Sequence, residues 1–217
     1  MLIRVQSRGF SLLELMVGVA ILGILMAFAV PNLRDFFVNA RVQTTAENFL
    51  AGVQKARAEA VAKNQDVQII LTDDAIATGI QNSVTPLAGD GVTTSAGRNW
   101  VVRYANPKSS DPNDPCGITS AYCLVEAKSS AESSSGGGAY DPTIFVAAPS
   151  WGSAIIFTSL SNSRSPTTKI IFSSTKAACQ SAGGPVRCLA VYISPGGQSR
   201  LCDPSVTAQT DNRACPP

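Results

Sequence analysis

The sequence contains no histidine, and this absence narrows the chemistry that the chain can support. Histidine is the commonest general base in enzymes and the commonest zinc ligand. The sequence also lacks the Gly-x-Ser-x-Gly turn that holds a nucleophilic serine. The glycine run at 136–138 lacks the Lys-Ser/Thr of a phosphate-binding loop. We therefore expect neither enzymatic activity nor a cofactor.

Charge is also scarce. Charged residues make up 15% of the chain, and the formal net charge is +2. A chain this close to neutral does not attract nucleic acid over its whole surface. Any contact with a polyanion would have to come from a local cluster of basic side chains.

The N-terminal half of the chain lacks cysteine, and six cysteines follow in the second half: Cys116, Cys123, Cys179, Cys188, Cys202 and Cys215. An even number in an exported domain indicates disulfides formed in an oxidising compartment. We favour pairing between sequence neighbours (116 with 123, 179 with 188, 202 with 215), because each short loop contains turn-forming residues. Other pairings stay open. Zinc is disfavoured because no Cys-x-x-Cys occurs.

An apolar run at residues 10–30 follows a short basic leader and ends before Pro31. Roughly twenty apolar residues are enough for one membrane crossing as a helix. The run contains a single ionisable residue, Glu14. A carboxylate at that depth costs about 2.5–3.5 kcal/mol even on the gentler insertion scales, so we expect it to have a function and a partner.

Gly9 is followed directly by Phe10, and an acidic residue, Glu14, lies five residues after the glycine. This pattern resembles the N-terminal signal of type IV pilins and type II secretion pseudopilins. The resemblance implies cleavage after Gly9 by a prepilin peptidase and N-methylation of Phe10. It also implies that Glu14 pairs with the N-terminal amine of a neighbouring subunit during filament assembly.

Two simpler interpretations of the N-terminus compete with this one. Ala27-Phe28-Ala29 is a small-x-small sequence after an apolar stretch, as in a secretory signal peptide. A plain membrane anchor is the other alternative. Glu14 argues against a signal peptide, because it lies where the apolar core of such a peptide should begin.

Beyond Pro31, which we expect to kink the helix, the pattern predicts an amphipathic continuation to residue 64. Its apolar stripe is formed by Ala46, Phe49, Val53, Ala56 and Ala60. After residue 64, short β-rich runs separated by turn formers predict antiparallel strands. The predicted strands cover residues 67–72, 100–104, 123–126, 143–146, 154–158, 170–173, 187–193 and 199–202. Residues 106–117 and 129–138 are predicted to be surface loops.

The sequence therefore predicts an α+β protein of the type IV pilin-like fold. A long kinked N-terminal helix, with a membrane-spanning first half, would pack on a β-rich antiparallel head. The expected parts are a leader (1–9), a transmembrane or filament-core helix (10–30), its amphipathic continuation (31–64) and a periplasmic head with disulfides (65–217). Residues 58–64, 67–70 and 192–203 resemble the GspH/FimT subgroup of minor pilins and pseudopilins, whose heads contain two β-sheets.

The resemblance implies a minor type IV pilin that helps to prime or assemble a pilus, at or near its tip, and that supports adhesion, twitching or DNA uptake. A type II secretion pseudopilin is the alternative. Implied partners are the prepilin peptidase, other pilins or pseudopilins and the inner-membrane assembly platform. The implied location is the inner membrane of a Gram-negative bacterium, with the head in the periplasm, and then the filament.

Binding to DNA is a further alternative. Some FimT-like proteins bind DNA through a C-terminal Gly-Arg-x-Arg stretch, and the matching residues 197–200 read Gly-Gln-Ser-Arg here. Arg200 therefore keeps the second arginine, while Gln198 replaces the first. Arg187 and Arg213 are possible neighbours. One or two phosphate contacts give only weak, salt-dependent binding.

Overall fold

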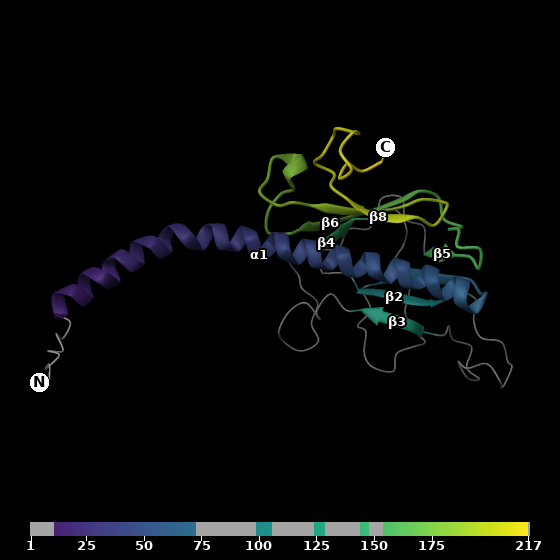
Figure 1. Ribbon diagram of the computed structural model, residues 1–217, viewed down its shortest axis with the longest axis horizontal. Helices are drawn as coiled ribbons and strands as arrows, with labels where there is room; N and C mark the ends of the chain where they lie inside the picture. The colour runs from purple at the N-terminus through teal and green to yellow at the C-terminus, as the bar shows by residue number, and fades with distance from the viewer. Residues whose placement is uncertain (1–10, 73–98, 106–123, 129–143, 148–153, 217) are drawn as a thin grey trace, which may run out of the picture. The chain divides into compact units, whose positions relative to one another are not determined.

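A computed structural model describes residues 11–72, 99–105, 124–128, 144–147 and 154–216 (Figure 1). The side chains at 28–32, 72, 124, 144, 145 and 147 are outside this description. The chain divides into two compact units, Met1–Phe37 and Val38–Pro217. The predicted loops at 106–117 and 129–138, together with Gly9 and Phe10, lie outside the described residues.

The helix α1 (Leu12–Lys63) begins and ends with recognisable caps. Its C-terminal cap is Asn64, which has a left-handed φ of 51°. The Asn64 N–H donates to the Val61 carbonyl oxygen over 3.4 Å, and the Gln65 N–H donates to that of Ala60 over 3.2 Å. This pair of bonds is a Schellman motif, in which asparagine takes the place that glycine usually fills. The predicted end of the helix near residue 64 is confirmed.

The helix runs through residue 31 without interruption, as the sequence predicts. The kink at that position stays a prediction. Among the described residues, no helix is both long and apolar enough to cross a membrane. The membrane-spanning helix proposed for residues 10–30 therefore also stays a prediction.

In the part of the chain that the structure describes, the strands form two antiparallel sheets of four strands each. The first has the order β3-β2-β1-β5 and contains β1 (Val67–Thr72), β2 (Asn99–Tyr104), β3 (Leu124–Lys128) and β5 (Ile155–Phe157). The second has the order β4-β6-β7-β8 and contains β4 (Ile144–Ala147), β6 (Thr168–Ser174), β7 (Leu189–Ile193) and β8 (Ser199–Cys202). Each predicted strand is confirmed within about two residues, which is the usual uncertainty of strand ends.

The C-terminal half of α1 joins both sheets in one hydrophobic core (Figure 1). The predicted apolar stripe on the helix is fully buried. Phe49 contacts the Trp100 ring on β2 edge to face, with centroids 6.4 Å apart, and the Phe172 ring on β6 at 5.6 Å. One helical side chain therefore touches both sheets. Trp100 is only 5% exposed and anchors the core, while Trp151 lies outside the described residues.

Two of the three predicted disulfides are present, Cys179–Cys188 and Cys202–Cys215. The first closes a loop around the short 3₁₀ helix η2 (Gln180–Ala182). The second connects the end of β8 to the C-terminal segment. Cys116 and Cys123 both lie outside the described residues, so their pairing stays a prediction.

Candidate functional site

The first candidate site is the start of α1, where Ser11 caps the helix. The Glu14 N–H donates to Ser11 Oγ over 3.2 Å, and the Leu15 N–H donates to the Ser11 carbonyl oxygen over 3.2 Å. Ser11 is thus the N-cap residue, and Glu14 occupies the third helical position. Ser-x-x-Glu is the sequence of a capping box, in which the serine satisfies a free N–H of the first turn.

The cap gives Glu14 a structural role that the sequence analysis missed. A carboxylate in the first turn is stabilised by the positive end of the helix dipole. The Ser-x-x-Glu spacing at residues 11–14 was the signal that could have shown it. Glu14 is therefore both a helix-start residue and the predicted assembly contact, and a test of the second role must control for the first.

The surroundings of Glu14 are apolar and open. Leu12, Leu13, Leu15 and Met16 are between 62% and 78% exposed, and further large apolar side chains are exposed along α1 as far as Met26. Within the described part of the chain, no cation pairs with the Glu14 carboxylate. An apolar helical surface of this extent is typical of a site that another molecule covers.

The second candidate site contains the three arginines proposed as DNA contacts. The structure brings them together around the loop closed by Cys202–Cys215. Arg187 Nε lies 2.9 Å from Asp203 Oδ2, and Arg213 Nη2 lies 2.7 Å from Asp211 Oδ2. Arg200 Nη2 donates to the Ala214 carbonyl oxygen over 3.1 Å.

These contacts weaken the DNA interpretation. Asp203 neutralises Arg187, and Asp211 neutralises Arg213. Arg200 already donates a hydrogen bond to the C-terminal segment. A phosphate would have to compete with a carboxylate at Arg187 and at Arg213. The two aspartate partners were not predicted, because only basic residues were considered as contacts for DNA.

The two aspartates differ in their environments. Asp203 is buried, and burial raises the pKa of its carboxyl group. Hydrogen bonds from Ser205 and Arg187 outweigh burial, so the pKa of Asp203 is lowered overall. Hydrogen bonds from Arg213 lower the pKa of Asp211 to about 2. Both carboxylates are therefore charged at neutral pH and act as fixed anions beside their arginines.

Metal binding finds no support in the described residues, which contain no group of three or more His, Cys, Asp or Glu side chains able to hold an ion. The sulfur atoms of the four described cysteines are committed to the two disulfides.

Comparison with known proteins yields three kinds of similarity. Residues 4–30 match the family described as the prokaryotic N-terminal methylation motif. A fimbrial protein EcpC of Eikenella corrodens is 38% identical over 103 residues, which are 47% of this chain. The matched region spans 63% of that relative's length.

Two crystal structures of the type IV minor pilin FimU of Pseudomonas aeruginosa are also similar. They cover 77% and 80% of this chain and 97% of their own, at 20% identity, with TM-scores of 0.39 and 0.42. The methylation motif lies on the residues that the sequence analysis singled out, Gly9, Phe10 and Glu14. The motif and the fimbrial relative together make the chain similar to type IV pilin-like proteins, over the N-terminal motif and over 103 residues respectively.

Proposed function

We propose that the chain is a minor pilin that is cleaved after Gly9, methylated at Phe10 and incorporated into a type IV pilus. The observation that carries the proposal is the first part of α1, which presents exposed apolar side chains around one unpaired acid, Glu14. In a filament, neighbouring helices would cover the apolar surface. The new N-terminal amine of the next subunit would supply the missing cation.

The role is structural rather than catalytic. Assembly would begin at the inner membrane, with the head in the periplasm, and would involve the prepilin peptidase, other pilins and the assembly platform. A place at or near the pilus tip is part of this proposal, as is support for adhesion and twitching. A pseudopilin of a type II secretion system would use the same helix and head. A contribution to DNA uptake is less supported, because two of the three candidate arginines carry carboxylate partners.

The experiment compares Glu14→Ala with Glu14→Gln. Glutamine can still fill the third position of a capping box, so Glu14→Gln removes the charge and leaves the helix start intact. Both variants should be cleaved and inserted normally, because the apolar run is unchanged or more apolar. Both should lower incorporation into sheared filaments by about tenfold or more, because an ion pair shielded from water is broken.

The measurement is an immunoblot of sheared pili beside an immunoblot of total membranes, which controls for expression. Wild-type incorporation of both variants would refute the proposed charge contact. A loss for Glu14→Ala alone would show that Glu14 acts by starting its helix, and the assembly role would then be withdrawn.

A further inference from the structure

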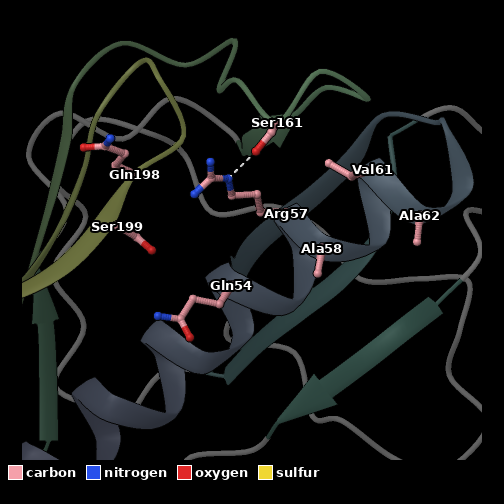
Figure 2. Close-up of a pocket in the computed structure, with 8 residues that line it drawn as sticks. All are labelled: Gln54, Arg57, Ala58, Val61, Ala62, Ser161, Gln198 and Ser199. Atoms are coloured by element: carbon pink, nitrogen blue, oxygen red, sulfur yellow. Dashed lines mark hydrogen bonds between the residues drawn. The ribbon is translucent and has the colours of Figure 1, made fainter.

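An open groove of about 810 Å³ lies on the head, on the outer side of the C-terminal half of α1 (Figure 2). Gln54, Arg57 and Val61 on α1 form one wall. Ser161, in the loop after β5, closes one end, and Gln198 and Ser199 of the β7–β8 hairpin form the facing wall. Its volume is in the range of ligand-binding clefts.

Arg57 is the cation of this groove, and it is held in place from one side. Its Nε–H donates to Ser161 Oγ, as Figure 2 shows. Its side chain is half-buried, and no carboxylate of the described residues pairs with it. Two nearby cations, by contrast, do have carboxylate partners: Lys55 pairs with Glu126, and Arg164 pairs with Asp66. A partly desolvated guanidinium with one neutral partner has donors left for a carboxylate.

The β7–β8 hairpin, which faces Arg57, is fixed to the loop that contains Ser161. Gly197 has a φ of 75°, and a Cβ atom there would overlap the Ser161 carbonyl oxygen. The Ser163 N–H donates to the Pro195 carbonyl oxygen over 2.9 Å and fastens the loop to the hairpin. Ser161 itself has a φ of 69°, which is uncommon for a residue other than glycine. The groove is therefore preformed, which lowers the entropy lost on binding.

The lining fits a peptide better than a nucleic acid. Val61 is 51% exposed in the groove wall, and Leu160, next to Ser161, is 79% exposed. The side-chain amides of Gln54 and Gln198 can donate to and accept from a peptide backbone. A single cation offers one phosphate contact, and no lining residue is aromatic, so base stacking has no platform.

We propose that this groove binds an acidic segment of a partner protein, with an Asp or Glu carboxylate on Arg57 and an adjacent apolar side chain on Val61. The inference is independent of the proposed filament role, because it concerns the head and involves neither Phe10 nor Glu14. It also gives residues 198 and 199 a role that does not depend on the missing arginine of the Gly-Arg-x-Arg pattern.

The test begins with a phage-displayed library of random 12-residue peptides, selected on the full-length protein in detergent. Enriched sequences should share an Asp or Glu beside an apolar residue. The best of them is then synthesised and titrated against wild type and variants by fluorescence anisotropy. Arg57→Gln should raise its Kd by about tenfold or more, because a charge-assisted hydrogen bond is lost.

Two further variants separate the groove from general effects. Lys55→Gln removes the same charge from the same helix outside the groove and should change the Kd by less than about twofold. Ala58→Phe keeps Arg57 but fills the groove from an exposed helical position, so it should also raise the Kd by about tenfold or more. Thermal unfolding of each variant checks that the head remains folded.

Three outcomes would overturn the proposal. The first is a failure to enrich any acidic sequence. The second is equal binding of the chosen peptide to wild type and Arg57→Gln. The third is Arg57-dependent binding of a twelve-nucleotide oligothymidine that exceeds binding of the peptide, which would assign the groove to nucleic acid instead.

Discussion

Gly52 is the residue on which the contact between α1 and the first sheet depends. A Cβ atom at this position would lie 2.7 Å from the Cη2 and Cζ3 atoms of Trp100. Trp100 is only 5% exposed and is packed edge to face against Phe49. The ring therefore has little room to move away, and the helix needs a residue without a side chain here.

Gly52→Ala should destabilise the head, although alanine favours a helix by about 1 kcal/mol over glycine. The forced shift of a packed core should cost about 1–3 kcal/mol and outweigh that gain. Thermal unfolding followed by tryptophan fluorescence measures the effect. Gly23→Ala is the matched control, because a Cβ atom there meets nothing within 4 Å. A Gly52→Ala variant as stable as wild type would show that the Trp100 contact is loose.

Contacts close in sequence were predictable at the residue level, and distant ones were not. The Ser11–Glu14 cap spans three positions, and its spacing can be read directly from the sequence. The Arg57–Ser161 bond spans 104 positions. Hydrogen bonds between distant residues produce no periodic pattern in the sequence, because the two residues meet only when the sheets are assembled. The groove around Arg57 was therefore invisible in the sequence, while Glu14 was not.

At the level of elements, Asp203 holds the C-terminal loop to the second sheet. Its carboxylate accepts hydrogen bonds from the Ser205 N–H and from Arg187 Nε, each over 2.9 Å. Its own N–H donates to the Arg213 carbonyl oxygen over 2.7 Å. Asp203, which follows β8, thus connects to the segment before β7 through its buried side chain and to the last turn of the chain through its backbone N–H.

The lowered pKa of Asp203 predicts a pH-dependent stability. Since the folded state holds the proton less tightly than the unfolded state, the carboxylate stabilises the fold at neutral pH. That contribution should decline as the pH falls below the ordinary value of 3.8 towards the lowered one. Asp203→Asn should cost roughly 1–3 kcal/mol at pH 7, and its difference from wild type should shrink as the pH falls.

Urea unfolding between pH 7 and pH 2 measures this dependence. Asp211→Asn is the comparison, because its partner Arg213 is 65% exposed and the pair is screened by solvent and salt. At physiological ionic strength, Asp211→Asn should change stability very little. If the difference between Asp203→Asn and wild type stayed constant with pH, the stabilising charge would lie elsewhere.

The strands themselves were predictable, but their arrangement in sheets was not. The strands predicted at residues 67–72 and 199–202 match β1 and β8 to the residue. The order of the chain would favour pairing β4 with β5, which follow each other. Instead β5 joins β1 in the first sheet, and β4 joins β6 in the second. Side chains alternate between the two faces of a strand whichever strand lies beside it. The alternation in the sequence therefore does not indicate which strands pair.

At the level of the whole molecule, the N-terminus decides how the protein is processed. Residues 27–29, which resemble a signal-peptide site, lie inside α1. Cleavage after Ala29 would cut a continuous helix. Cleavage after Gly9 would instead leave α1 intact, with Phe10 and its cap residue Ser11 at the new end.

Mass spectrometry of the protein from its native host should show a chain that starts with N-methylated Phe10. Gly9→Val should retain the leader, because the pilin-type signal places the cut directly after glycine. A mature chain that begins at Val30, or an uncleaved chain in the wild type, would contradict the assignment of residues 4–30 to the methylation motif.

The sharing of one helix by two sheets also has a consequence for biosynthesis. The apolar stripe on α1 emerges early in translation, but its partners on β6 and β7 are complete only when residue 193 has been made. Until then, the nascent chain exposes Phe49 and its neighbours without their native cover. Contacts between such distant segments form slowly, and exposed apolar surface favours aggregation in the meantime. Chaperone protection of this helix during synthesis should therefore raise the yield of folded protein.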